Sequence, residues 1–381
     1  MPNARSIQFV PLTQESVPAT EEFNKRLQSA RVPSFRCIAN RDRNGEPPEP
    51  MEVEGYVAVD ADGQVRGGYL LRWQRLWLRG EQLQGAALGL PISEGIVDQR
   101  YAMVGLSVLR DATKRCEHLY ACGGGGRNAV HFRVLQHVGW QIQDVPFLFR
   151  VIKGRNFLRR LPQAQSPARR FAGTIAGVTG VSHFATGLLH ATSAIRHAGT
   201  SSLRPTSDIH VEEVPSLSAA AEEVWSCVKS QYGFCVVRDG AHVDPAFPPE
   251  REDLHRLVVR RGGAIIGWCV VMAQSLSRLK AFLGDVVPGL IVDTFGDTSD
   301  STEIARAATA FLADQGVDVV LTNTSHHSWL SAYKRIGFLS WASQYPVIVS
   351  KSLAQRIGDL PGTMLHAHIT RGDGDGVHYL H

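Results

Sequence analysis

Several residues in this chain carry side chains that could do chemistry, and their neighbours in the sequence narrow what each could do. Asp293 lies inside the apolar run Leu290–Phe295, so we expect a buried carboxylate with a partner, serving a structural or a catalytic purpose. His326 and His327 are adjacent rather than one helical turn apart, so we expect no shared metal ion there. The four glycines at 123–126 are followed by no Lys-Ser or Lys-Thr pair, which favours room for a substrate over a phosphate-binding loop.

Two further patterns point away from metal and redox chemistry. The segment 371–376, Arg-Gly-Asp-Gly-Asp-Gly, begins like a calcium-binding loop, but a full loop from Asp373 would pass His381, so we expect a tight turn before a short strand at 378–380. The six cysteines show no Cys-x-x-Cys spacing, and we interpret them as reduced, mostly buried thiols of a cytoplasmic protein. No metal site is therefore predicted.

A longer pattern occurs twice, about two hundred residues apart. Arg127–Trp140 and Ser325–Phe338 each follow a short apolar run, read as a helix and end in glycine and an aromatic residue. An apolar segment containing proline follows both copies, around Pro146 and Pro346. Self-similarity over this distance predicts two copies of one domain rather than a solenoid of short repeats.

The predicted elements follow the same order in both halves, strand-helix-three strands-helix-strand-helix-strand. Turn residues at Asp60–Gly63 and Gly262–Gly263 predict hairpins in the two halves. Asp300 and Glu303 predict a capping pair at the start of the second half's helix 301–315. The predicted helices are 15–29, 101–114 and 128–138 in the first half and 218–232, 301–315 and 328–336 in the second.

This order, together with the repeated motif, resembles the GNAT (N-acetyltransferase) superfamily. The helix after the fifth strand of that family typically carries Asn, then Ala three residues on, Tyr seven on, and Gly-Phe eleven and twelve on. Asn128 and Gly139-Trp140 match in the first copy, where His131 takes the Ala place and Leu135 the Tyr place. In the second copy Tyr333 and Gly337-Phe338 match, while His326 and Trp329 replace Asn and Ala. The resemblance implies an α/β (α+β) fold with two GNAT-like domains, each a mixed, mostly antiparallel sheet flanked by helices.

The resemblance also implies where coenzyme A would bind. The family holds its pyrophosphate on a loop of the form Arg/Gln-x-x-Gly-x-Gly/Ala that starts a helix, where free amides and the helix dipole favour an anion. In the first half, Arg100 and Gly105 match the first and last defined positions of this motif, whereas Met103 stands where the family has Gly. The second half has Asp297 and Asp300 at this place, which would repel a phosphate. The implied cofactor-binding residues are therefore all in the first half: Arg100, Ala102, Met103, Val104, Gly105 and Asn128.

The implied catalytic residues come from both halves. Similar enzymes place an acidic base at or just after the fourth strand, where Glu94 lies in the first half and Asp293 in the second. Glu94 has an alternative role as a turn or helix-capping carboxylate. Tyr333 matches the tyrosine that protonates the departing thiolate, with plain helix packing as its alternative role. Leu135 replaces that tyrosine in the first half, so His131, one turn away on the same face, is the nearest substitute.

Composition is that of a globular chain with a basic segment between the copies. Of 381 residues, 44% are apolar and 20% charged, which excludes a disordered chain and suits two domains. Between residues 151 and 207 there are eight Lys and Arg and no acidic residue. We place an N-terminal domain at 1–152, a basic linker with helices at 153–207 and a C-terminal domain at 208–381. The uncharged stretch 171–195 predicts a helix packed between domains, with membrane-surface association as the alternative.

Three functions fit these observations. The first is an N-acyltransferase that uses acetyl-CoA or another acyl-CoA and acts on a small-molecule amine. Residues 93–105 and the tail 370–376 look like two-domain acetyltransferase-like proteins found beside bacterial polysaccharide genes, which implies an amino sugar or sugar nucleotide as acceptor. The second is a Fem-type transferase that takes an aminoacyl group from transfer RNA, although sparse aromatic residues in the basic segment argue against nucleic acid as a partner. The third is a non-catalytic binding or scaffold protein. The oligomeric state is left open.

Overall fold

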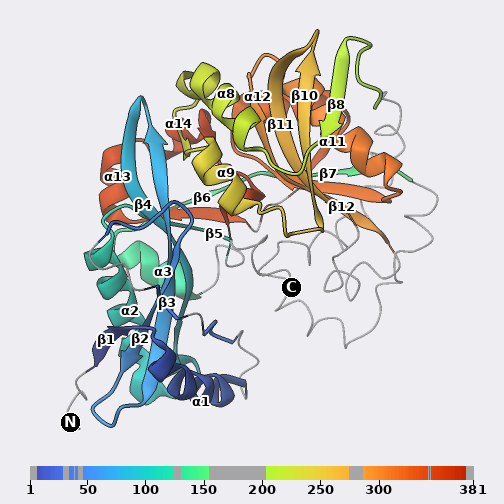
Figure 1. Cartoon of the computed structure of the whole chain (residues 1–381). Coiled ribbons are helices and arrows are strands. Elements are labelled where there is room, and N and C mark those ends of the chain that lie inside the picture. Colours follow the sequence, from blue (N-terminus) through green and yellow to red (C-terminus); the bar gives the residue numbers. More distant parts are fainter. Residues whose placement is uncertain are drawn as a thin grey trace. The chain divides into compact units, whose positions relative to one another are not determined.

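The chain forms two compact units (Figure 1). The computed structural model describes residues 7–28, 34–37, 39–41, 46–123, 130–153, 203–273, 286–341, 343 and 345–374. One unit comprises residues 1–75 and 83–121, and the other comprises residues 76–82 and 122–381. The linker expected at 153–207 falls almost entirely outside the described residues, as do the stretch 171–195 and the strand expected at 378–380. The boundaries drawn from the sequence at residues 152 and 208 stay a prediction.

The first unit is a sheet with helices. Its elements are β1 (Gln8–Pro11), η1 (Gln14–Ser16), α1 (Val17–Gln28), β2 (Val53–Val59), β3 (Val65–Leu78), β4 (Glu81–Ser93), η2 (Glu94–Ile96), η3 (Gln99–Tyr101), α2 (Ala102–Arg115) and β5 (Leu119–Cys122). Residues 76–82 at the turn between β3 and β4, and Cys122 at the end of β5, are counted with the other unit. The strands lie in the order β1-β2-β3-β4-β5, antiparallel from β1 to β3 and parallel between β4 and β5. The sheet is therefore mixed, as predicted.

Local sequence explains these elements. The β2–β3 turn forms at the predicted place because the Asp60 carboxylate accepts the amides of Asp62 and Gln64, and Gly63 takes a φ of +76°. Helices α1 and α2 are amphipathic. Their buried residues recur at three- and four-residue spacing, as expected for helices that cover a sheet: Thr20, Phe23 and Leu27 in α1, and Val104, Val108 and Ala112 in α2.

The second unit contains most of the chain. Its first elements are α3 (Val130–His137), β6 (Gln141–Asp144), β7 (Phe147–Val151), β8 (Ile209–Glu213), α8 (Ser218–Val228), η4 (Lys229–Gln231), β9 (Phe234–Val236), α9 (Gly240–Ala246), β10 (Leu254–Arg261) and β11 (Ala264–Ala273). The remaining elements are β12 (Pro288–Gly296), α11 (Ser301–Asp314), β13 (Val319–Asn323), α12 (His327–Arg335), β14 (Leu339–Trp341), β15 (Pro346–Val349), α13 (Lys351–Ile357), α14 (Leu360–Met364), β16 (Ala367–His368) and η5 (Arg371–Asp373).

A seven-stranded mixed sheet organises this unit. Its order is β14-β7-β13-β12-β11-β10-β8, with a parallel pair at β12–β13. Helix α11 packs closely on β11 and β12, because a Cβ at Gly267 or Gly296 would lie only 2.5 or 2.6 Å from the Ile304 side chain. Because Gly267 and Gly296 have no Cβ, α11 can approach the sheet this closely. The apolar side chains of α8, α11, α12 and the sheet form one buried core.

The two sequence copies exchange a strand within this unit. Strand β7 follows the first copy's helix α3, yet it lies between β13 and β14 of the second copy. Strand β15 follows the second copy's α12, yet it pairs antiparallel with β6 of the first copy. Each copy therefore donates a strand to the other, and the two copies read from the sequence are not the two compact units.

The fold predicted from the sequence is confirmed, with one local correction. The described residues contain two mixed sheets flanked by helices. The capping pair expected at Asp300 and Glu303 is wrong, because the Asp300 side chain caps no amide of α11 and instead pairs with Arg261. No helix among the described residues is long and apolar enough to cross a membrane.

Candidate functional site

Strand β4 changes course before its carboxyl end. Leu90 has a φ of +44°, a conformation that a branched side chain rarely adopts. The parallel register with β5 covers Ala86 opposite Leu119 and Ala87 opposite Tyr120, and β4 then continues to Ser93 without a partner on β5. The two described strands therefore diverge beyond Ala87, at the edge from which the chain turns toward α2.

Helix α2 begins with its amide groups free of a side-chain cap. Its N-cap is Tyr101, whose side chain makes no capping hydrogen bond. Gly95 lies against this helix start, since a Cβ there would come within 2.8 Å of the Tyr101 carbonyl oxygen and of the Ala102 Cα. The short turn η3 leads directly into α2, so the Ala102 amide donates to the Gln99 carbonyl and the Asp98 carboxylate accepts the Arg100 amide. The helix dipole favours an anion at this end of α2.

The residues expected to hold the coenzyme lie around this helix start. Ala102 and Met103 are exposed, Val104 is buried, and Gly105 faces Ser93, whose Oγ would be 3.3 Å from an added Cβ. Arg100 is exposed and pairs with Asp98, with 2.6 Å between its guanidinium and the carboxylate. The structure thus brings Arg100, Ala102, Met103, Val104 and Gly105 together, whereas Asn128 lies outside the described residues.

Glu94 is buried in a cluster of ion pairs. Its Oε1 accepts from Arg26 at 2.9 Å and its Oε2 accepts from Arg66 at 2.9 Å. Arg66 also binds Asp60 at 2.7 Å and stacks on the Tyr101 ring at 4.3 Å. Glu94 therefore ties the turn after β4 to α1 and β3.

Asp293 in the second unit is buried and paired, as expected. Its Oδ2 accepts from Arg238 Nε at 3.1 Å, and its Oδ1 lies 3.6 Å from His368 Nε2. Burial alone would raise the pKa of Asp293, but the charge of Arg238 holds that pKa below its usual range. Arg238 also binds both carboxylate oxygens of Asp373, at 2.9 and 2.8 Å. One buried guanidinium thus joins β12 to the residues of the tail.

The C-terminal segment 367–373 lies beside β12 and β13. These strands are in parallel register only from Pro288 to Leu290, and Thr324, just beyond β13, pairs with Thr370 in an isolated antiparallel bridge. On the β12 side, His368 Nε2 donates to the Thr294 carbonyl at 2.7 Å. A Cβ at Gly372 would lie 3.3 Å from that of Asp293. The chain's own tail therefore takes up the space where β12 and β13 separate.

The remaining predicted catalytic residues lie in the second unit. Tyr333 on α12 is fully buried, with its hydroxyl 3.4 Å from Thr294 Oγ1, and burial raises the pKa of this phenol. Thr294 is the neighbour of Asp293 on β12, so these two predicted residues share one region of the core. The backbone of His131 lies in α3. The roles of all four predicted catalytic residues stay predictions.

Sequence reasoning missed Arg238, His368 and Asp373. Arg238 follows the short strand β9, which no turn or periodicity signal had indicated. An acidic residue within an apolar run calls for a partner, but the sequence does not say which of 40 Lys and Arg provides it.

Comparison with known proteins gives a likeness in structure only. No family model and no curated protein matches the sequence. A conserved protein of Enterococcus faecalis, described as a probable N-acyltransferase, is 11% identical with a TM-score of 0.51, over 91% of this chain and 73% of that one. A GCN5-related N-acetyltransferase of Anabaena variabilis is 10% identical with a TM-score of 0.53, over 90% of this chain and 72% of that one.

A third match carries a bound acyl-CoA. It is the N-myristoyltransferase of Saccharomyces cerevisiae with myristoyl-CoA, 9% identical with a TM-score of 0.50, over 92% of this chain and 83% of that one. The chain has the GNAT fold. In terms of that fold, β4 to α2 and β12 to α11 are the two corresponding strand-to-helix turns. Segment 367–373 lies beside β12 at the second of them.

Proposed function

We propose that this GNAT-fold chain is an N-acyltransferase that uses an acyl-CoA as co-substrate and acts on a small-molecule amine. The observation that carries the proposal is the divergence of β4 from β5 beyond Ala87, next to the uncapped start of α2. A thioester could lie along the free edge of β4 while its pyrophosphate meets the helix amides. The similar structures, which include an N-myristoyltransferase with myristoyl-CoA, support the same class of co-substrate.

The reaction transfers one acyl group between two nucleophiles. The amine nitrogen attacks the thioester carbonyl, the carbon–sulfur bond breaks, the nitrogen loses a proton and the coenzyme A thiolate gains one. Glu94 is the proposed base in the first copy. The amine is proposed to be an amino sugar or sugar nucleotide, in a cytoplasmic setting, with acetyl as the acyl group.

The second copy supports a single site per chain. Segment 367–373 lies where a co-substrate would pair with β12, and it is held by the buried Arg238–Asp373 ion pair. Asp297 and Asp300 at the start of α11 would repel a pyrophosphate. We therefore assign the acyl-CoA to the first copy and a structural role to the Asp293 region.

Isothermal titration of the full chain with acetyl-CoA and with longer acyl-CoAs tests the proposal. We expect one ligand per chain and a rise in melting temperature with ligand concentration. Mass spectrometry of amine mixtures incubated with chain and acyl-CoA then identifies the acylated acceptor. Absence of both heat and thermal shift at millimolar acyl-CoA would leave a non-catalytic GNAT-fold protein or a Fem-type transferase, and binding of aminoacyl-tRNA separates those two.

A further inference from the structure

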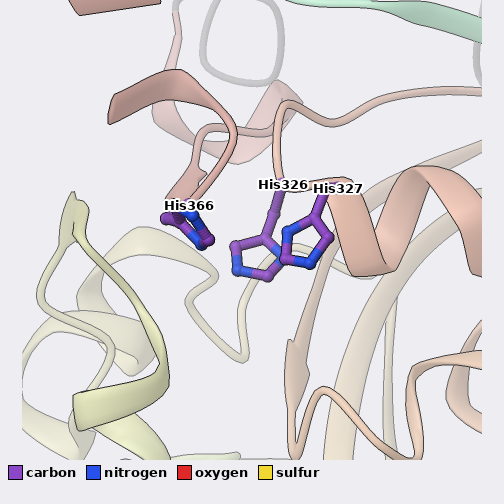
Figure 2. A group of neighbouring side chains, drawn as sticks. All are labelled: His326, His327 and His366. Atoms are coloured by element: carbon purple, nitrogen blue, oxygen red, sulfur yellow. The ribbon is translucent and has the colours of Figure 1, made fainter. Parts of the chain in front are cut away.

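Three histidines of the second unit gather outside the sites described above. His326 is the N-cap of α12, His327 is its first residue, and His366 directly precedes β16. One ring nitrogen from each histidine lies within 4.8 Å of the other two. Figure 2 shows the three rings together; their centroids are 4.8 Å apart for His326 and His327, 5.1 Å for His327 and His366, and 6.2 Å for His326 and His366. The sequence hides this cluster, because His366 is distant in the chain from the adjacent pair.

The hydrogen bonds of His327 leave one of its ring nitrogens suited to a metal. Its Nδ1 lies 2.9 Å from the Leu365 carbonyl oxygen, which can only accept, so Nδ1 carries the proton and Nε2 keeps its lone pair. The Ser328 hydroxyl lies 3.4 Å from Nε2 and can turn to solvent when a metal binds there. In a metal-binding histidine, the ring nitrogen that does not bind the metal commonly donates its hydrogen to a group such as a backbone carbonyl. The bond also ties α12 to the chain just before His366.

His326 provides the second indication of a ligand. Its side chain is buried, with 1% of the residue exposed, and its Nε2 makes no hydrogen bond of good geometry among the described residues, where the Gln231 backbone makes only a weaker contact with the ring. A buried polar atom without a partner costs free energy, so the site favours a ligand for it. Nδ1 accepts the Ser328 amide at 3.2 Å, and a metal on Nε2 would move the ring proton to Nδ1. Ser328 is half-buried, so a water molecule can accept the hydrogen of its amide in place of His326 Nδ1.

Three imidazoles without a carboxylate define the class of ion. Neutral imidazole nitrogens suit zinc, copper and nickel, whereas calcium and magnesium prefer oxygen. A tetrahedral zinc ion with bonds of about 2.0–2.1 Å needs ligand nitrogens roughly 3.4 Å apart. His327 and His366 are exposed and can rotate to close the distance, leaving a fourth position for water.

We propose that His326, His327 and His366 bind one divalent transition-metal ion, with zinc as the fitting metal, which fastens the tail segment to α12. The location gives the ion this role. His366 starts the segment that places His368 and Thr370 beside β12 and β13, and Ser325 next to His326 already donates its amide to Ile369 at 3.1 Å. A metal ion bound at this point would link the start of α12 to the segment that begins at His366. This role does not depend on acyl transfer.

Zinc binding by the full chain tests this proposal. The protein, made without a polyhistidine tag and stripped with a chelator, is titrated with zinc chloride in a calorimeter and in thermal unfolding. We expect one zinc per chain and a higher melting temperature, with no effect of magnesium or calcium. His327→Ala and His366→Ala are the variants of choice, because both side chains are exposed, whereas loss of buried His326 risks the fold. Each should weaken zinc binding by about a hundredfold or more, since even outer partners of metal ligands are worth 10–100-fold.

His137→Ala is the matched control. His137 is exposed on α3, and its Nδ1 contacts the Arg133 carbonyl as that of His327 contacts Leu365, but it lies outside the cluster. It should bind zinc as the unmodified chain does. Cobalt provides a second readout, because a tetrahedral site gives intense visible absorption that both cluster variants should lose. Equal zinc affinity in His327→Ala, His366→Ala and the unmodified chain would overturn the proposal, as would no zinc binding at all.

Discussion

At the scale of single residues, Glu94 combines a catalytic prediction with a structural contact. Replacing it with Gln removes the charge that pairs with Arg26 and Arg66, so we expect a loss of stability of about 3 kcal/mol. If Glu94 is the base, turnover by the folded protein should also fall by an order of magnitude or more. Calorimetric unfolding and acyl-transfer kinetics, measured well below the melting temperature, separate the two effects.

Asp60→Asn is the control for Glu94→Gln. It removes a carboxylate from the same Arg66 but leaves Oδ1 to accept the turn amides. It should lower stability and leave turnover unchanged. Equal rates in Glu94→Gln and Asp60→Asn would assign Glu94 to structure alone.

Asp293 predicts a particular dependence of stability on pH. Its pKa in the folded chain is held below the ordinary value of 3.8, so its ion pair stabilises the fold above that pH and the contribution is lost as pH falls through the lowered pKa. Asp293→Asn should cost about 3 kcal/mol at neutral pH because Arg238 loses one partner. Denaturant unfolding of Asp293→Asn and of the unmodified chain at several pH values measures the difference between their unfolding free energies. We expect this difference to become smaller below pH 3.8. A difference in unfolding free energy that does not change with pH would contradict an ionised Asp293 paired with Arg238.

The sequence predicted the type of these residues better than their partners. An aspartate within an apolar run had to be buried and paired, because an isolated buried charge is too costly. Its partner Arg238 is 55 residues before it in the chain, and Asp373, which binds the same guanidinium, is 80 residues after it. No periodicity encodes such a pairing. The exposed start of α2, in contrast, followed directly from local spacing.

At the scale of elements, the tail segment 367–373 should be sensitive to small increases in volume. A Cβ at Gly372 would lie 2.9 Å from Phe247 and 3.3 Å from Asp293. Gly372→Ala is therefore expected to destabilise the second unit by about 1–3 kcal/mol through overpacking. Leu365→Ala is the control, because that side chain is exposed just before the segment. Thermal unfolding measures both, and equal melting temperatures would mean that the segment can move away from β12.

The main helices and hairpins were predictable, but the short elements β9, α9, α13 and α14 and the strand pairing were not. Turn residues and hydrophobic periodicity locate the hairpins and the main helices because those signals are local. The exchange of β7 and β15 was not predicted, because either copy could have kept its own strand with the same local pattern. The choice depends on pairings that are distant in sequence, and these carry no local signal.

At the scale of the whole molecule, two copies of one fold have come to differ in chemistry. The first turn of α2 has no acidic side chain, and Asp98 in the turn before it is paired with Arg100, whereas the first turn of α11 carries Glu303. The second copy also has its own tail beside the strand that would receive a co-substrate. We infer from these differences that the first copy is the one that would bind a phosphate.

That asymmetry predicts how the two helix starts respond to the same added charge. Met103→Glu puts a carboxylate on an exposed position in the first turn of α2, where it should not disturb packing. Repulsion of a bound pyrophosphate should weaken acyl-CoA binding about tenfold. Thr302→Glu adds the same charge to the first turn of α11 and should leave binding unchanged, as measured by calorimetry at one ionic strength. If Thr302→Glu weakened binding and Met103→Glu did not, the coenzyme would belong to the second copy, and segment 367–373 would have to move to admit it.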